Sequence, residues 1–196
     1  MSVIAQAGAK GRQLHKFGGS SLADAKCYLR VAGIMTEYSQ AGDMMVVSAA
    51  GSTTNQLISW LKLSQTDRLS AHQVQQSLRR YQMDLISGLL SPDAADTLIA
   101  TFIQDLERLA GLLDGGVTDA VYAEVVGHGE VWSARLMAAV LNHLGVEAAW
   151  LDARSFLRAE RSPQPQVDEG LSYPLLQQLM AQHPNKRPVV TGFISR

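Results

Sequence analysis

The first segment of the sequence that could do chemistry is the stretch KFGGSS, which begins at Lys16. It follows a short run, residues 13–17, that predicts a strand, and it precedes a helical pattern over 22–38. Between a strand and a helix, Gly18 and Gly19 let successive backbone N–H groups point toward one anion, and the helix dipole adds partial positive charge. Lys16 would supply a full charge. A tight turn with a surface lysine is the alternative, because the residue order matches neither common nucleotide-binding fingerprint.

A second candidate segment consists of eight small residues, 48–55, that join an apolar run at 44–48 to a helical pattern. The apolar run predicts a strand buried on both faces, as in a parallel sheet. Loops at the carboxyl ends of parallel strands bind ligands, and small side chains let a ligand approach the backbone. Ser48, Thr53 and Thr54 offer hydroxyl groups there. The alternative is an ordinary polar turn in which Thr53 or Thr54 caps the next helix.

The third candidate is GHGE, residues 127–130, which lies inside a long helical pattern. Each interior glycine costs about 1 kcal/mol relative to alanine, so two glycines this close indicate that something packs against the backbone. Glu130, at the edge of the apolar stripe, could bind an ammonium group. A solvated glutamate beside a helix kink is the alternative. His128 has no second His or Cys at ligand spacing, so we expect a structural role and no metal site.

The elements that position these segments begin with a β-α-β unit. Residues 13–17, the glycine turn, the helix and the buried strand form this unit, and its crossover is right-handed in nearly all known cases. Ser21 with Asp24 predicts a capping box at the start of the helix. The helix face toward the sheet is predicted to carry Leu22, Ala25, Leu29 and Ala32.

Apolar spacing predicts only helices between Asn55 and Leu113. One of these helices carries Tyr81 on its apolar stripe. The sequence therefore predicts a helical layer, about residues 61–117, inserted into an α/β sheet domain. The later elements are predicted as a helix, a buried strand, a loop or short edge hairpin, a helix and a final strand, at 119–144, 148–152, 153–168, 171–181 and 188–194.

Length and composition limit the class of protein. The chain has 196 residues, 46% hydrophobic and 18% charged, which fits one domain, or one with an inserted subdomain, and excludes a chain that is as a whole a disordered tail. A net charge of −1 provides no field that would recruit nucleic acid or an anionic membrane. The longest apolar stretch, 44–51, is far shorter than the roughly 20 residues of a membrane helix, and residues 1–12 lack a signal or transit pattern, so we expect a cytoplasmic protein. The single cysteine, Cys27, excludes an internal disulfide and a multi-cysteine metal cluster.

Five stretches of the sequence resemble the aspartate kinases in order and approximate spacing. They are KFGGSS at 16–21, VVSAAGSTTN at 46–55, GHGE at 127–130, a strand ending in Asp152, and VVTGFI at 189–194. The resemblance covers essentially the whole chain. Within the family, the sequence is most similar to the amino-terminal part of the bifunctional aspartokinase/homoserine dehydrogenases of the methionine pathway in enteric bacteria.

The resemblance implies the amino acid kinase fold, a three-layer α/β/α sandwich. It also implies phosphorylation of the β-carboxylate of L-aspartate to 4-phospho-L-aspartate, with ATP and Mg²⁺. On this resemblance, Lys16 neutralises the transferring phosphoryl group. The other implied roles are a phosphate cradle of Gly18, Gly19 and Ser20, an aspartate pocket lined by Ser48 and Thr54, and a contact from Glu130 to the substrate amino group. These roles suit phosphoryl transfer, which needs mainly alignment and charge stabilisation.

The sequence departs from the family pattern within two of these stretches. Gly127 stands where the family usually has a serine, and Ala50 and Ser52 alter the second loop. These differences affect the fine contacts of the implied pocket.

A larger difference from the family lies at the end of the sequence. In the family, the last strand is followed by a segment rich in Gly-Arg-Gly, with Ser-Asp, that carries most of the nucleotide pocket, whereas this sequence stops at Arg196. We expect a flexible tail over 1–12, the amino-terminal part of a kinase domain over 13–196, and little activity from the chain alone. A last strand without a covering helix predicts a homo-oligomer. NAD(P) chemistry would belong only to the dehydrogenase module of the bifunctional relatives, which is absent here.

Two other functions are compatible with the residues. One is a kinase of the same fold with another small acid or phosphate acceptor, as in carbamate, acetylglutamate or uridylate kinases. The second loop and GHGE disfavour it. The other is a non-catalytic assembly or interaction module, in which Lys16 and the glycines form only a turn.

Overall fold

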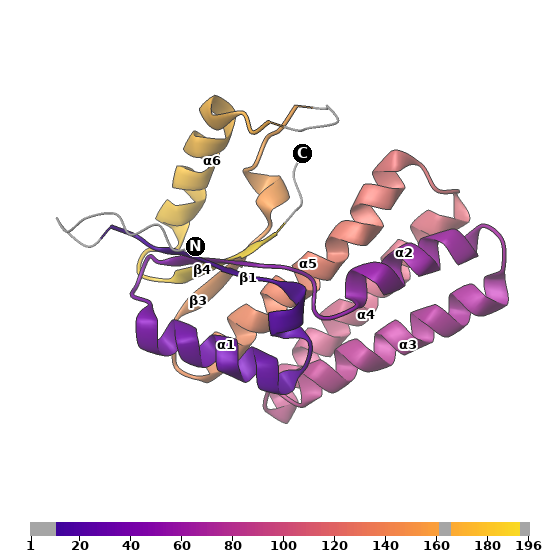
Figure 1. Ribbon diagram of the computed structural model, residues 1–196, viewed down its shortest axis with the longest axis horizontal. Coiled ribbons are helices and arrows are strands. Elements are labelled where there is room, and N and C mark those ends of the chain that lie inside the picture. The colour runs from indigo at the N-terminus through magenta and orange to yellow at the C-terminus, as the bar shows by residue number, and fades with distance from the viewer. Residues whose placement is uncertain (1–10, 161–165, 193–196) are drawn as a thin grey trace.

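The computed structural model of the protein, which describes residues 11–160 and 166–192, contains a four-stranded parallel sheet (Figure 1). The strands are β1 (Leu14–Phe17), β2 (Met44–Val47), β3 (Ala148–Leu151) and β4 (Arg187–Thr191). They lie in the order β1-β2-β4-β3, and each neighbouring pair is parallel. The four carboxyl ends therefore reach the same edge of the sheet.

Strand register places the predicted lysine on one face of the sheet. Lys16 is paired with Val46, and Val46 with Val190, so these three side chains lie on the same face. Their neighbours Met45 and Val189 point to the opposite face, where both are fully buried. The strand at 44–48 is therefore covered on both sides, as its wholly apolar composition predicts.

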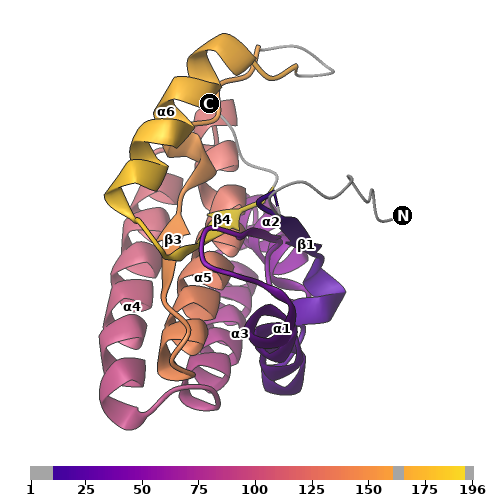
Figure 2. The same ribbon diagram turned by 90° about the vertical axis from the view of Figure 1, so that its left-hand side faces the viewer.

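Helices cover both faces of this sheet, and Figures 1 and 2 show them on opposite sides. Two helices, α1 (Ala25–Tyr38) and α5 (Asp119–His143), lie on the face of Met45, and α6 (Glu169–Gln182) lies on the other. On the α6 side, Val190 packs in a smaller cluster with leucines of the helix. The arrangement is the three-layer α/β/α sandwich that the resemblance implies.

The helical layer consists of three helices that extend to one side of the sheet in Figure 1. They are α2 (Thr53–Ser64), α3 (Arg68–Ser87) and α4 (Pro92–Asp114). Their apolar stripes join the core beneath the sheet, and Phe102 of α4 packs edge-on against Trp132 of α5 with ring centroids 4.9 Å apart. The layer therefore shares one core with the sheet. Within the described residues, no helix is long and apolar enough to cross a membrane.

Some of the predicted segments lie outside the described residues. These are residues 1–10 of the expected amino-terminal tail and residues 193–194 of the predicted last strand. An antiparallel bridge between Ala159 and Val167 agrees with the predicted edge hairpin. The boundaries of the tail and of the helical layer stay predictions.

The predicted start of the first helix is wrong by about one turn. A short 3-10 helix, η1 (Gly19–Leu22), follows the glycines, and α1 begins only after Asp24. The Asp24 carboxylate accepts a hydrogen bond of 2.8 Å from the Cys27 N–H, so Asp24 is the N-cap and Ser21 is not. The positive end of α1 thus lies beyond the glycine turn. Among the predicted stripe residues, Leu29 is 47% exposed, because the buried face of α1 carries Tyr28, Val31, Ala32 and Met35.

The glycine-containing part of α5 packs closely against the loop after β2. A Cβ atom built on Gly129 would lie 2.8 Å from the Cβ of Ala49, 3.4 Å from the Thr53 methyl group and 3.5 Å from a methyl carbon of Leu57. Real Cβ atoms essentially never come as close as 2.8 Å to another heavy atom. The prediction that something packs against the backbone of GHGE is therefore confirmed for Gly129.

Replacing Gly129 by alanine should consequently destabilise the fold. We expect Gly129→Ala to lower the free energy of unfolding by about 1–3 kcal/mol, because the added methyl group overpacks the contact with Ala49. The matched control is Gly33→Ala in α1, where an added Cβ meets nothing within 4 Å. This control should raise stability by up to about 1 kcal/mol through helix propensity. Denaturant unfolding measures both, and equal effects of the two substitutions would contradict the close packing.

Candidate active site at the carboxyl edge of the sheet

Lys16 lies at the carboxyl end of β1 with its ammonium group over the glycine turn. A Cβ atom built on Gly18 would lie 3.6 Å from the Lys16 Nζ atom. The side chain is exposed, and within the described ranges it forms no ion pair with a carboxylate. Its charge is therefore available to an anion at this edge.

The glycine turn and the loop after β2 are in direct backbone contact. The Gly51 N–H donates to the Gly19 carbonyl at 3.1 Å, and the Ser48 N–H donates to the Phe17 carbonyl at 3.1 Å. A Cβ atom on Gly19 would lie 2.8 Å from the Ala49 carbonyl oxygen. Gly51 has φ of +51°, a conformation that side chains disfavour. Glycine at both positions therefore allows the two loops to approach.

Glu130 approaches the same loop from α5. Its side chain is only 8% exposed, and its Oε1 atom accepts a hydrogen bond of 3.4 Å from the Ala49 N–H. Burial raises the pKa of Glu130, since water is removed from the charged form, although the Ala49 N–H opposes this effect. No ion pair reaches this carboxylate from the part of the chain that the structure describes, which suits it to receive an ammonium group from a ligand.

The hydroxyl groups of the second loop divide into two kinds. Ser48 is half-buried at the end of β2, and Thr54 is half-buried in the first turn of α2. Ser20, which belongs to the glycine turn, is exposed in η1. Thr53 is fully buried, and its Oγ1 atom accepts a hydrogen bond of 2.9 Å from the Gln82 amide of α3. Neither threonine caps α2, because Ser52 is the N-cap residue and makes no side-chain cap bond. The capping alternative is therefore wrong.

The structure thus brings three predicted segments together. The glycine turn after Lys16, the loop from Ser48, and Glu130 of α5 all meet around Ala49 at the carboxyl edge of the sheet. Which ligand atoms each residue binds stays a prediction.

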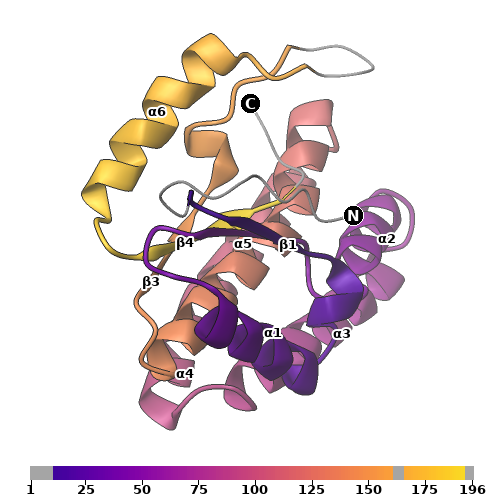
Figure 3. The same ribbon diagram turned by 60° about the vertical axis from the view of Figure 1, so that its left-hand side comes forward.

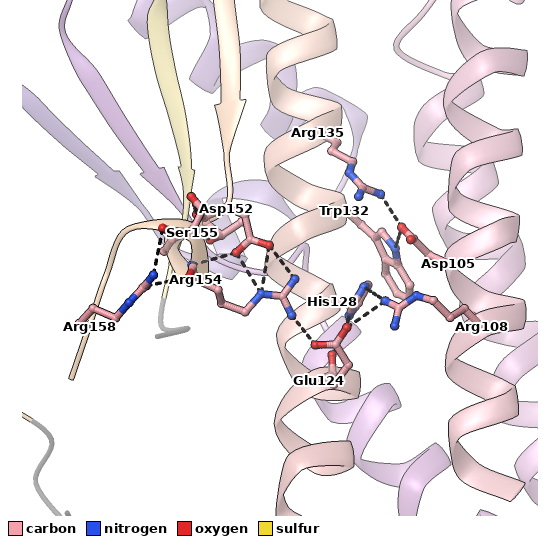
Figure 4. Close-up of polar contacts among 12 residues, drawn as sticks. Asp105, Arg108, Glu124, His128, Trp132, Arg135, Asp152, Arg154, Ser155 and Arg158 are labelled. Atoms are coloured by element: carbon pink, nitrogen blue, oxygen red, sulfur yellow. Dashed lines mark hydrogen bonds and ion pairs between the residues drawn. The ribbon is translucent and has the colours of Figure 1, made fainter. Parts of the chain in front are cut away.

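A charged network fixes the end of β3 at the same edge (Figure 4). The Arg154 guanidinium donates to both carboxylate oxygens of Asp152, at 3.0 and 2.7 Å, and to Glu124 of α5 at 2.7 Å. Arg108 of α4 donates to the other oxygen of Glu124 at 2.9 Å. Burial alone would raise the pKa of Asp152, but the hydrogen bonds from Arg154 outweigh it and hold that pKa below its ordinary value. The network joins β3, α5 and α4.

His128 belongs to this network and plays a structural part in it. Its ring is 2% exposed, with Nε2 2.7 Å from a nitrogen of Arg108 and Nδ1 2.6 Å from the Glu124 carbonyl (Figure 4). Because arginine can only donate, Nε2 accepts and Nδ1 carries the proton. Burial lowers the pKa of His128, which favours this neutral form. Within residues 11–160 and 166–192, no group of three His, Cys, Asp or Glu could hold a metal ion.

Sequence reasoning missed Arg154, Glu124 and Arg108. Glu124 is 16 residues from Arg108 and 30 residues from Arg154, so no motif spacing reveals these two pairs. The only local signal is an arginine two positions after Asp152, at the end of a predicted strand.

Comparison with known proteins agrees with this geometry. The profile of the amino acid kinase family matches residues 11–196. The chain belongs to the amino acid kinase family. It is 84% identical over 196 residues to bifunctional aspartokinase/homoserine dehydrogenase 2 of Escherichia coli K12, which covers all of this chain and 24% of that protein. It is 29% identical over 193 residues to the chloroplastic bifunctional aspartokinase/homoserine dehydrogenase 1 of Arabidopsis thaliana, covering 93% of this chain and 21% of the relative.

Solved structures of this family share the fold. E. coli aspartokinase III in complex with aspartate and ADP superposes with a TM-score of 0.82 at 24% identity, over 94% of this chain and 41% of that one. The aspartate kinase of Clostridium acetobutylicum gives a TM-score of 0.69 at 23% identity, over 93% and 39%. This chain spans about a quarter of the length of the E. coli bifunctional relative, 24%.

Removing the charge of Glu130 should stabilise the protein in the absence of ligand. Burial raises the pKa of Glu130 in the folded state above its pKa in the unfolded chain. The contribution of Glu130 to the free energy of unfolding is therefore complete below the pKa of the unfolded chain, and it is lost as the pH rises through the pKa of the folded state. Glu130→Gln should therefore raise the free energy of unfolding near neutral pH by about 0.5–2 kcal/mol, as do other substitutions at strained functional sites. The gain should shrink as pH falls toward about 4, the ordinary pKa of a carboxyl group.

Denaturant unfolding of the two proteins across this pH range measures the effect. The control is Glu37→Gln, at an exposed position of α1, which should leave the pH dependence unchanged. A Glu130→Gln protein that is less stable than the parent near neutral pH would show that the carboxylate is already stabilised by a partner.

Proposed function

We propose that the chain supplies the aspartate-binding and phosphate-handling part of an ATP-dependent aspartate kinase, which converts L-aspartate to 4-phospho-L-aspartate. The observation that carries the proposal is that the glycine turn beneath the Lys16 ammonium group, a hydroxyl-bearing loop and a buried glutamate meet around Ala49. The names of the relatives, aspartokinases among them, point to the same reaction. We also propose that the whole protein binds aspartate and ATP and forms a homo-oligomer.

The proposed reaction needs only a few contributions from these residues. An oxygen of the β-carboxylate attacks the γ-phosphorus of ATP, the bond to the bridging oxygen breaks, and its electron pair leaves with ADP. Lys16 and the N–H groups of the glycine turn stabilise the charge on the transferring group. Glu130 holds the α-ammonium group of aspartate, while Ser48 and Thr54 offer hydrogen bonds beside it. Alignment of the two reactants then lowers the barrier.

Mg²⁺ enters this proposal with the nucleotide. Among the described residues, no group of three His, Cys, Asp or Glu side chains could hold a metal ion. Mg²⁺ is commonly bound through substrate phosphates with few protein ligands. We therefore assign no step of the reaction to it.

The function is tested by trapping the acyl phosphate. Purified native polypeptide containing this chain is incubated with MgATP and L-aspartate, and 4-phosphoaspartate is captured with hydroxylamine and quantified. Glutamate, N-acetylglutamate, carbamate and uridylate serve as alternative acceptors, and formation of ADP measures their phosphorylation. Product formed with aspartate and with no other acceptor supports the proposal, whereas product formed with another acceptor identifies a different kinase of this fold. If no acceptor reacts and neither ATP nor aspartate raises the melting temperature, the protein is a non-catalytic module.

The lysine should matter more for turnover than for substrate binding. Lys16→Ala should lower kcat about 100-fold or more and change the KM for aspartate by less than about threefold, because its charge acts on the transferring phosphoryl group. The control is Lys62→Ala, at an exposed position of α2. Steady-state kinetics of the three proteins measure the effect. An unchanged kcat would remove Lys16 from the proposed role.

A further inference from the structure

Tyr81 of α3 contacts both loops of the candidate active site, the one after β1 and the one after β2. Its hydroxyl group donates to the Ala23 carbonyl at 2.9 Å, directly after η1 and the glycine turn. The same hydroxyl lies against the second loop, because a Cβ atom built on Gly51 would be 2.7 Å from it. Figure 3 shows η1 between the end of β1 and α3. One side chain of the helical layer therefore touches the segments on both sides of the site.

The next residue, Gln82, reaches the second loop at another point. It is 3% exposed, and its amide donates to the Thr53 hydroxyl at 2.9 Å. Thr53 is the first residue of α2 and is fully buried. A buried amide without a partner is costly, so this bond fixes the start of α2 relative to α3. The adjacent Thr54 belongs to the proposed aspartate pocket.

Packing of α3 does not require these two polar groups. Leu78 and Leu85 are 0% and 4% exposed and hold the helix in the core. Successive residues on a helix point about 100° apart, which lets neighbours on α3 reach different segments. The polar atoms of Tyr81 and Gln82 are thus explained by their contacts with the two loops.

We propose that Tyr81 and Gln82, named here the α3 clamp, are positioning residues that hold the phosphate-binding turn and the aspartate-binding loop in the geometry needed for phosphoryl transfer. This inference rests on the proposed function. The loops touch each other directly through the bond from Gly51 to Gly19, and the clamp ties both to one rigid helix. A displacement of about 1 Å between reactants can lower a rate about 100-fold. The clamp therefore acts on turnover and leaves substrate affinity largely unchanged.

The first test uses variants that remove only the polar contacts. Tyr81→Phe and Gln82→Met, made in the native polypeptide, should each lower kcat about tenfold and change both KM values by less than about twofold. The melting temperature should fall by no more than about 4 °C, because each variant loses one hydrogen bond. Matched controls are Tyr38→Phe and Gln73→Met, at exposed positions, which should leave kcat unchanged.

A double-mutant cycle tests the contact from Gln82 to Thr53. Thr53→Ser keeps the hydroxyl group and should retain most of kcat, whereas Thr53→Val should match Gln82→Met. Combining Gln82→Met with Thr53→Val should cost no more than either single change, since both remove the same bond. Additive losses would overturn the assignment of Gln82. For either clamp residue, a lower melting temperature with unchanged kcat, or a higher KM with unchanged kcat, would overturn a positioning role.

Hydrogen exchange separates failure of the clamp from failure of the proposed function. Exchange of the Gly51 N–H, which donates to Gly19, should be about tenfold faster in Tyr81→Phe than in the parent, as expected for a loop that opens locally. If the parent makes no phosphoaspartate, the proposed function is wrong. The exchange rate of the Gly51 N–H then tests by itself whether the α3 clamp holds the two loops. Unchanged exchange at Gly51 would overturn it in either case.

Discussion

The backbone of Ala49 is the meeting point on which the candidate active site depends. Its N–H donates to Glu130, its carbonyl lies against Gly19, and its methyl group lies against Gly129. A Cβ atom at either glycine would come within 2.8 Å of Ala49, so the contact exists only because both positions lack a side chain. This close approach brings Lys16, on the first strand, to the same edge as a carboxylate on the fifth helix. The site is therefore a consequence of backbone packing.

The buried charge of Glu130 lowers the stability of the folded protein. Glu130 is buried without a cationic neighbour in the described residues, and burial raises its pKa. The large apolar core shared by the sheet and the helical layer supports this unfavourable arrangement. By contrast, the charges at the end of β3 are paired, with Arg154 between Asp152 and Glu124. One part of the edge thus holds a buried carboxylate with no ion pair among the described residues, and the other is fixed by internal ion pairs.

Much of the fold could be predicted from the sequence, because apolar periodicity depends on local residues. Apolar periodicity predicts the parallel strands and the long helix through GHGE, and the cost of two glycines inside that helix predicts the packing against Gly129. The start of α1 could not be predicted, since Ser21 and Asp24 are both acceptable caps and only tertiary packing selects the aspartate. The role of Tyr81 was also hidden, because a tyrosine on an apolar stripe resembles a core residue until its hydroxyl partner is known. Long-range pairs such as Arg154 with Glu124 have no local signature.

A crystal structure of the native polypeptide with bound L-aspartate would test the central claim most directly. The account predicts that the α-ammonium group lies within hydrogen-bonding distance of Glu130. It also predicts that the β-carboxylate points toward the glycine turn and Lys16, beside the loop around Ala49. Aspartate bound elsewhere, or bound here with its ammonium group away from Glu130, would contradict it.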